Sequence, residues 1–137
     1  MLCDRRGAPL ALTISAANCN DMKVALPTVD GIVVPRPQPR PYHPQHLCLD
    51  KGYDYPEIEA GLVERKYRPH IRRRGEEKID PATGRQHPAR RWVVERTNSW
   101  HNRFRKLLIR WEKKAQNYLA LTQLACALII YRMMVLG

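Results

Sequence analysis

The order of apolar and polar residues predicts alternating strands and helices in the first half of the chain. Leu10, Leu12 and Ile14 alternate with small or polar residues, which is the two-residue period of a strand. The turn-like residues 4–7 precede this strand, so the chain is expected to begin with the tip and second half of a hairpin. Asparagines and an aspartate then provide N-cap residues for a short helix over about 21–30.

The next segments predict a linker followed by a strand, a helix and a second strand. Residues 34–45 contain five of the eleven prolines, which excludes a helix or a central strand and favours an extended linker. The short apolar run His46 to Leu49 predicts a strand that ends at Asp50. A helical pattern with proline in its first turn covers 55–67, and a short strand with a basic end follows from Arg68.

Two helices are expected at the C-terminal end, after a segment without apolar periodicity that predicts a loop over 75–90. From Ala89 onward, apolar residues recur at three- and four-residue steps and predict one amphipathic stripe: Trp92, Val93, Trp100, Phe104, Leu107, Leu108 and Trp111. The second helix, about 115–134, is apolar almost all round, which indicates burial. The whole order favours an α/β fold with helices against a mixed sheet.

Charge narrows the class of partner. The chain has 137 residues, enough for one domain, and a formal net charge of +11 in which arginine dominates. A polyanion is therefore the natural partner, either nucleic acid or an anionic membrane. The uncharged run Ala115 to Tyr131 contains three amides and is expected to be a core helix and not a membrane span. The four cysteines form no CxxC pair, which fits a reducing cytosol.

Two carboxylates stand out within this basic chain. Asp50 follows a strand directly, at the end where open α/β sheets keep their ligands, and Gly52 lets the backbone turn away. Glu95 lies in the amphipathic helix on the face away from the aromatic stripe, four residues after Arg91. A turn aspartate and a solvated glutamate are the ordinary explanations. Acids in an arginine-rich surround are also suited to hold a divalent cation against phosphate.

At these residues the chain resembles a known family. "LCLDKGYD" and "RRWVVERTNSWHNRFRKLLIRWEKKAQNYLALTQLACALIIYRM" are similar to the C-terminal half of bacterial insertion-sequence transposases of the DDE type. The closest group is the IS-five-like branch, whose catalytic domain is ribonuclease H-like. The resemblance implies an incomplete ribonuclease H-like fold, with a mixed sheet that lacks its first strand and two long C-terminal helices.

The resemblance also implies roles for individual residues. The second catalytic aspartate of the family falls on Asp50 and its catalytic glutamate on Glu95, so both are expected to be metal ligands. The signature arginine falls on Arg91, whereas Pro88 and Asn102 replace the family's tyrosine and lysine. The residues expected to contact DNA in addition are basic: Lys51, Arg72, Arg73, Arg74, Arg96, Arg103 and Lys106, with Arg65, Lys66, Arg68 and Arg105 as further candidates.

The family's first catalytic aspartate lies on a strand upstream of the hairpin, and no aspartate of this chain is matched to it. The chain is therefore expected to be one part of a transposase catalytic domain, inactive or nearly so by itself. Its expected divisions are a hairpin and helix over 1–33, the linker over 34–45, a strand–helix–strand–helix unit over 46–112, and a C-terminal helix over 113–137. The origin is either a decayed element or the second reading frame of a frameshifted enzyme.

The implied reaction is DNA cleavage and strand transfer with two Mg²⁺ or Mn²⁺ ions about 4 Å apart. The implied partners are DNA (element ends and target), an upstream-frame polypeptide and a second copy of the chain, in the bacterial cytoplasm at the nucleoid. Two alternatives remain. The chain is a non-catalytic basic DNA-binding module if Asp50 and Glu95 do not converge, or a membrane-associated basic protein if its last helix is an anchor.

Overall fold

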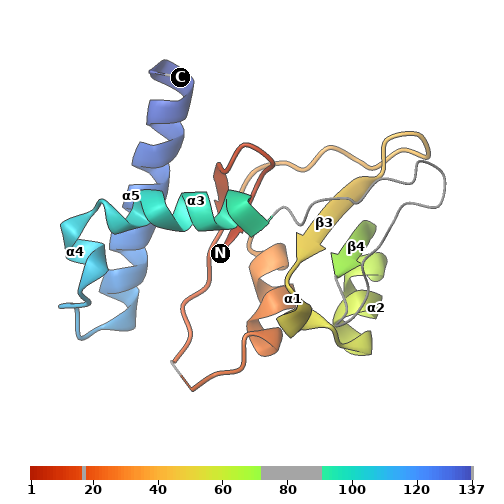
Figure 1. Ribbon diagram of the computed structural model, residues 1–137, viewed down its shortest axis with the longest axis horizontal. Helices are drawn as coiled ribbons and strands as arrows, with labels where there is room; N and C mark the ends of the chain where they lie inside the picture. The colour runs from red at the N-terminus through yellow and green to blue at the C-terminus, as the bar shows by residue number, and fades with distance from the viewer. Residues whose placement is uncertain (17, 72–90, 137) are drawn as a thin grey trace.

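The structure is a computed structural model that describes residues 1–16, 18–71 and 91–136 (Figure 1). The described part is a mixed α/β arrangement with short strands and several helices. Its elements follow in this order: β1 (Leu2–Cys3), β2 (Pro9–Ala11), α1 (Met22–Asp30), β3 (Gln45–Leu49), the 3₁₀ turn η1 (Lys51–Tyr53), α2 (Pro56–Glu64), β4 (Tyr67–Ile71), α3 (Arg91–Asn102), α4 (Arg105–Leu108) and α5 (Ala115–Val135).

The strands form two separate pairs. β1 and β2 are antiparallel, with Leu2 opposite Ala11, and β3 and β4 are parallel, with Gln45 opposite Tyr67 and Leu49 opposite Ile71. The expected single mixed sheet is therefore not continuous in the described residues, because β1 and β3 are not hydrogen-bonded to each other.

The main core lies where α1 and α2 pack against the parallel pair (Figure 1). Its side chains come from all four elements: Ala25, Val29, Leu47, Ile58, Leu62 and Tyr67. Helix α2 begins at Pro56, and proline is tolerated there because the first turn of a helix has no use for its backbone N–H. Two glutamates in the same turn stabilise the helix by their interaction with the positive end of its dipole. Gly61 permits close approach of α1, since a Cβ there would lie 2.6 Å from Leu26 Cδ1.

The turn between β1 and β2 fits tightly against α3. The Asp4 side chain accepts hydrogen bonds from the backbone N–H groups of Arg6 and Ala8, both at 2.8 Å. Gly7 has φ of +88°, and a Cβ there would lie 2.9 Å from Thr97 Oγ1. The Thr97 hydroxyl, which is fully buried, bonds to the Gly7 carbonyl at 2.8 Å. This turn therefore needs glycine both for its backbone conformation and for the contact with the helix.

Helix α3 is shorter than expected and buries a different face. It ends at Asn102, and the N–H groups of Arg103 and Phe104 bond three residues back before the chain becomes extended at Phe104. The aromatic stripe is therefore not continuous to Trp111. The buried side chains of the described part of α3 are Val93, Thr97 and His101, whereas Trp92 is 54% exposed and Trp111 is 76% exposed.

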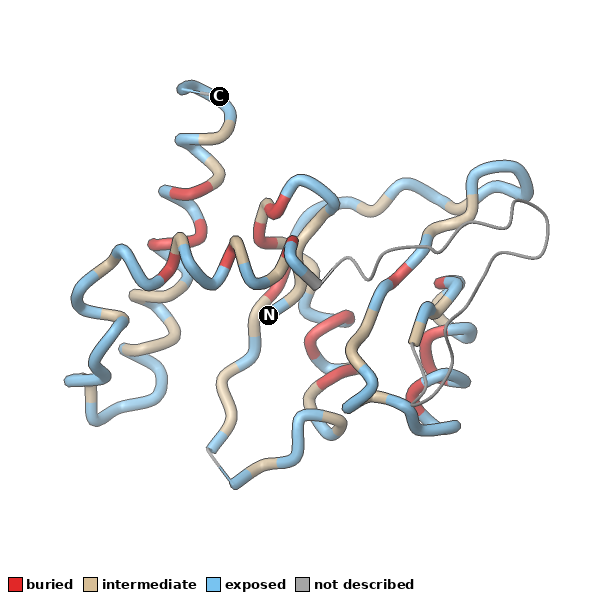
Figure 2. The backbone as a smooth tube through the Cα atoms, viewed as in Figure 1, coloured by how far each residue is buried: buried red, intermediate tan, exposed pale blue. Residues whose placement is uncertain are grey.

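The C-terminal helix α5 is the other departure from expectation. Only Ala125, Cys126 and Ile129 are buried on it, and Figure 2 shows most of this helix as exposed. His101 Nδ1 donates to the Thr97 carbonyl, which leaves Nε2 to accept from the Cys126 thiol at 3.2 Å. The expectation of a buried helix is wrong for most of its surface, because β2, α3 and α4 cover one side only. In the described residues, α5 alone has the length and hydropathy to cross a membrane.

The other elements lie close to their expected places. The helix expected at 21–30 is α1, the strand before Asp50 is β3, and the following helix and strand are α2 and β4. The strand expected from Leu10 is shorter, because β2 ends at Ala11. The loop expected over 75–90 lies outside the described residues.

Candidate active site

Asp50 stands at the end of β3 and begins a short turn. Its backbone is extended, with φ of −75° and ψ of 160°, and its side chain accepts a hydrogen bond of 2.8 Å from the Lys51 N–H. It therefore caps η1, and the ordinary turn interaction expected for a strand-end aspartate is present. A carboxylate has two oxygens with about four acceptor positions, so a cap and a cation can share it.

Tyr53 lies close enough to Asp50 and to Asp21 for both negative charges to act on its phenol. Tyr53 is half-buried against the main core, and this burial raises the pKa of its phenol above the ordinary value. The negative charges of Asp21 and Asp50 raise that pKa further. The Tyr53 side chain near Asp50 therefore stays a neutral phenol at physiological pH. Asp21 stands at the N-cap of α1, where its side chain makes no cap bond.

Glu95 lies on the exposed side of α3, one turn from the start of the helix. The buried side of α3 faces β1 and α5 through Val93, Thr97 and His101, which fixes the rotation of the helix. Trp92 is also on the exposed side, three residues before Glu95. The expectation that the aromatic residues and Glu95 lie on opposite faces is therefore wrong for Trp92.

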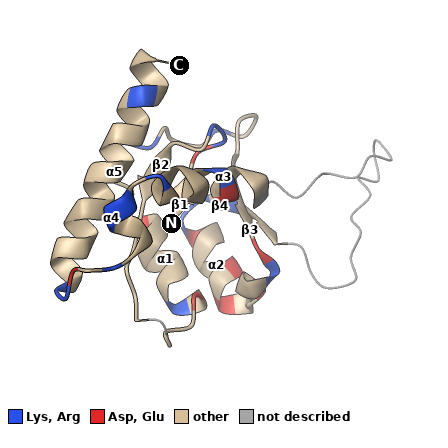
Figure 3. Ribbon diagram, turned by 60° about the vertical axis from the view of Figure 1, so that its left-hand side comes forward, with Lys and Arg blue, Asp and Glu red and all other residues tan. Residues whose placement is uncertain are grey.

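The structure brings the elements that carry the two acids to one region. In Figures 1 and 3, the N-terminal half of α3 lies beside the C-terminal end of β3. Among residues 1–16, 18–71 and 91–136, no group of three or more His, Cys, Asp or Glu side chains converges as a metal site. Two carboxylates fit the chemistry of Mg²⁺, which proteins usually bind through one or two carboxylates together with waters and phosphate oxygens.

The basic residues expected to contact DNA lie in several different environments. Lys51, Arg103 and Lys106 are exposed, as are Lys66, Arg68 and Arg105 among the further candidates. Arg65 is engaged in a two-point ion pair with Asp30, at 2.6 and 2.7 Å. Arg72, Arg73 and Arg74 lie outside the described residues, and Arg91 is described only as part of the α3 backbone. Figure 3 shows basic residues over several separate elements and not on one of them.

Arg96 has a different environment from the other arginines. Its guanidinium carbon lies 4.8 Å from the ring centre of Trp92 and 5.0 Å from that of Trp100, so it is held between the two indoles. It also donates to the Arg6 carbonyl in the β1–β2 turn. This stack was missed from the sequence, although the four-residue spacing of Trp92, Arg96 and Trp100 is a visible signal of one helix face.

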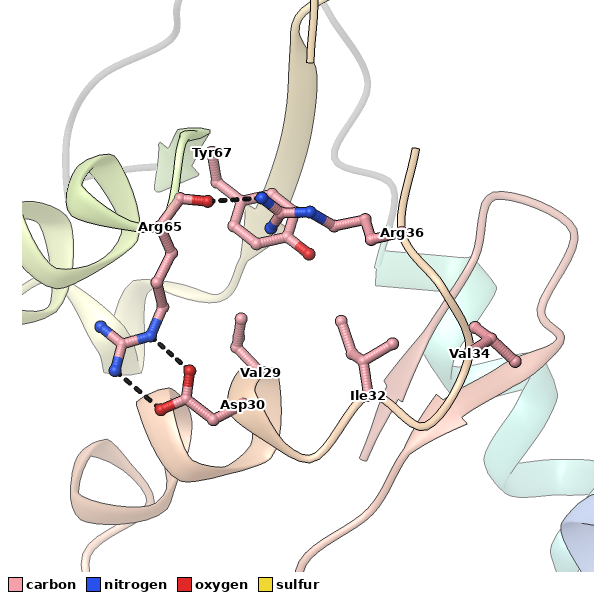
Figure 4. Close-up of a pocket in the computed structure, with 7 residues that line it drawn as sticks. All are labelled: Val29, Asp30, Ile32, Val34, Arg36, Arg65 and Tyr67. Carbon is pink, nitrogen blue, oxygen red and sulfur yellow. Dashed lines mark hydrogen bonds and ion pairs between the residues drawn. The ribbon is translucent and has the colours of Figure 1, made fainter. Parts of the chain in front are cut away.

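A cavity of about 280 Å³ lies away from the two acids, at the C-terminal end of α1 (Figure 4). Asp30 and Arg65 pair on one side of it, and Arg36 stacks over Tyr67 at 4.2 Å while donating to the Arg65 carbonyl. Asp30 and Arg65 thus neutralise each other across the cavity wall. The bond from Arg36 to the Arg65 carbonyl connects the proline-rich linker to the turn between α2 and β4. This cavity has the character of a structural joint.

The outer face of the parallel pair carries a histidine contact that the sequence did not predict. His46 Nδ1 and His70 Nε2 lie 2.6 Å apart, and the rings stack at 4.8 Å. The register places Cys48 opposite His70. His46 and Cys48 stand two residues apart on β3, and His70 lies next to them only because β3 and β4 pair in parallel.

The comparisons with known proteins agree with the resemblance in the sequence. The profile of the family described as "Transposase DDE domain" matches residues 1–130. A Burkholderia cepacia protein named "Putative transposase for insertion sequence element IS402" is 36% identical over 133 residues. That match covers 93% of this chain but only 59% of the relative, so the chain spans less than two thirds of the length of this relative. No solved structure matches significantly.

Proposed function

Since the chain belongs to the transposase DDE domain family, we propose that it forms part of the catalytic domain of an insertion-sequence transposase. Asp50 and Glu95 are the two carboxylates that this part contributes to metal-dependent DNA cleavage and strand transfer. The single observation that carries the proposal is the approach of the N-terminal half of α3 to the C-terminal end of β3 (Figure 3). Asp50 follows β3 directly, and Glu95 lies on α3.

Asp50 and Glu95 are held in position by different parts of the structure. Asp50 is fixed by the η1 cap, since its bond to the Lys51 N–H limits the rotation of the side chain. Glu95 is fixed through its helix, whose buried side packs against β1 and α5. When bound, Mg²⁺ or Mn²⁺ supplies Lewis acidity, which polarises phosphoryl oxygens and lowers the pKa of a water or 3′-hydroxyl. Asp50 and Glu95 would supply carboxylate oxygens to the bound metal ions, and the exposed basic residues would bind the DNA phosphates.

The third carboxylate comes from outside these 137 residues in this proposal. Two features support it. The chain spans 59% of the IS402 relative. Within the chain, Leu2 of β1 packs against the same core as Leu47 and Leu49 of β3, although the two strands share no ladder. A further strand between β1 and β3 would join the two pairs into one mixed, ribonuclease H-like sheet. In the described residues, β3 is paired with β4 only, so its other edge is open to such a strand.

The partners follow from this assignment. They are DNA (element ends and target) and the segment that carries the missing strand, supplied by a fusion or by an upstream reading frame. We place the protein in the bacterial cytoplasm at the nucleoid, with α5 as a helix that packs against protein and not as a membrane anchor. A second copy of the chain remains a further partner to be tested by the oligomeric state.

The test is metal-dependent nicking of a duplex that carries the terminal repeat of the element. The chain alone should give little or no nicking, and addition of the upstream segment should restore it in the presence of Mg²⁺ or Mn²⁺. Asp50→Asn and Glu95→Gln should each abolish the restored nicking while binding of the duplex remains. Robust nicking by the chain alone would contradict the missing-ligand assignment, and full activity of either variant would contradict its role.

The alternative of a non-catalytic DNA-binding module is supported by one observation. The described residues present no convergent set of three potential metal ligands. On this alternative, the duplex binds through basic residues, but addition of the upstream segment restores no nicking under any metal condition. The same experiment therefore separates the two functions.

A further inference from the structure

We propose that His46 and His70 form a two-ligand site for a divalent transition-metal ion, Ni²⁺ or Cu²⁺ in chemical character, on the outer face of the β3–β4 pair. The inference goes beyond the proposed function, because this site uses neither Asp50 nor Glu95 and takes no part in DNA cleavage. An ion held there joins the second residue of β3 to the fourth residue of β4.

The two imidazole rings present nitrogens to each other. His46 Nδ1 and His70 Nε2 lie 2.6 Å apart, and both side chains are exposed. A hydrogen bond between two neutral rings uses one N–H and one lone pair. A metal ion takes a lone pair from each of these nitrogens instead, while the other nitrogen of each ring carries the proton. The same two atoms can therefore be bridged by a proton or by an ion.

The separation of the nitrogens indicates which coordination geometry fits. With nitrogen–metal bonds of about 2.0–2.1 Å, two ligand nitrogens lie about 2.9 Å apart at a right angle and about 3.4 Å apart at a tetrahedral angle. The right angle needs the smaller movement from 2.6 Å, and it is the angle of tetragonal Cu²⁺ and Ni²⁺ sites. Imidazole suits these ions, whereas Mg²⁺ selects oxygen ligands. The site therefore differs in chemistry from the two carboxylates.

Parallel pairing places the two histidines on one face. Leu47 and Tyr67 are buried in the main core, so the alternation of side chains along each strand turns His46 and His70 to the other face. In the register His46 lies opposite Arg68, and His70 stands two residues further along β4. The bound ion is thus a cross-link between neighbouring strands, and it stabilises the folded chain in which the strands are paired.

Two neighbours on this face limit the site. Arg68 is exposed opposite His46, so its positive charge repels a cation there. Cys48 is exposed opposite His70. Across the described residues, however, no group of three or more His, Cys, Asp or Glu side chains is arranged to hold a metal ion. The site therefore has two protein ligands, and water completes the coordination.

The experiment titrates the untagged, reduced chain with NiCl₂ and follows binding by calorimetry and by thermal unfolding. Ni²⁺ is the probe because the four free cysteines favour softer ions. An ion that binds only the folded state should raise the unfolding temperature of the wild type by roughly 3 to 6 °C when free Ni²⁺ is ten times its dissociation constant. His46→Asn and His70→Asn should each weaken binding by roughly tenfold or more and lose most of this shift.

His43→Asn is the matched control, because His43 is also exposed but lies in the linker before β3. This variant and Cys48→Ser should both bind Ni²⁺ as the wild type does. Arg68→Gln should bind it roughly threefold more tightly, since a repelling charge is removed. Excess Mg²⁺ should not displace the Ni²⁺.

Three results would overturn the site: no Ni²⁺ binding by the wild type, binding undiminished in both His46→Asn and His70→Asn, or loss of binding in Cys48→Ser. The last result would replace the two-histidine site by one that depends on the thiol. None of them bears on the proposed function, which is measured by nicking of the terminal-repeat duplex.

Discussion

The two halves of the molecule bury their apolar surface to very different extents. Around β3 and β4, two helices close over one face of a parallel pair, and Leu62 becomes fully inaccessible. Around α5, by contrast, large apolar side chains remain on the surface, among them Leu124, Leu128 and Met134. The described residues therefore leave much of the apolar surface of α5 uncovered. In the β3–β4 unit, by contrast, α1 and α2 cover the apolar face of the strands.

The largest effect is expected in the well-covered half. Leu62→Ala should lower the free energy of unfolding by about 2 to 5 kcal/mol, because it opens a cavity in a side-chain cluster with no access to solvent. Leu128→Ala, on the open side of α5 and 40% exposed, is the matched control and should cost well under half as much. Chemical denaturation measures both, and equal losses would contradict the contrast between the two halves.

The next effect tests the junction between the hairpin turn and α3. Thr97→Val should destabilise the chain by about 1 to 3 kcal/mol, since the buried Gly7 carbonyl loses the hydroxyl that donates to it. Ser99→Ala on the exposed side of the same helix should change little. If the two variants unfold at the same denaturant concentration, the Gly7–Thr97 contact does not hold the turn in place.

Gly7→Ala should affect the same junction by a different route. The positive φ of Gly7 is unfavourable for alanine by roughly 1 to 2 kcal/mol, and the new Cβ would also press on Thr97. Gly52→Ala is the control, because nothing lies within 4 Å of a Cβ at that position. Thermal unfolding compares them, and a Gly7→Ala protein as stable as Gly52→Ala would contradict the tight fit of the turn against α3.

The smallest effect concerns the ion pair at the linker joint. Hydrogen bonds from Arg65 hold the pKa of Asp30 below its ordinary value. The pair therefore adds stability above the unfolded pKa of about 3.9, and this stability is lost as the pH falls through the lowered folded value. Because the Asp30 side chain is 54% exposed and that of Arg65 29% exposed, water screens the pair. Asp30→Asn should therefore cost less than Leu62→Ala, Thr97→Val or Gly7→Ala, and it should cost nothing in strong acid. A loss that persists at the lowest pH would assign the effect to packing.

Local chemistry made most of the elements predictable. Proline at the start of α2 and the apolar run before Asp50 each specify an element from a few neighbouring residues. The end of α3 at Asn102 was not predictable, since neither glycine nor proline marks it. The burial of Thr97 and His101 likewise depends on partners, Gly7 and Cys126, that lie far away in the sequence.

The candidate site shows the same division. Asp50 and Glu95 could be selected from the sequence because each acid stands in a motif that resembles a known family. The Trp92–Arg96–Trp100 stack could not, because its meaning depends on which side of α3 is covered, and the predicted stripe placed Trp92 on the covered side. The break in the sheet between β1 and β3 also arises from pairing, which residue periodicity does not encode.

The most direct test of the central claim asks whether Asp50 and Glu95 hold the same ion. Fe²⁺ with hydrogen peroxide, and ascorbate to reduce the iron again, cleaves a polypeptide close to the bound iron. The intact chain with element-end DNA should therefore yield cuts near residue 50 and near residue 95. Asp50→Asn should remove both cuts together, as should Glu95→Gln. A chain that is cut near only one of the two acids, or a variant of one acid that leaves the cut at the other, would contradict a shared site.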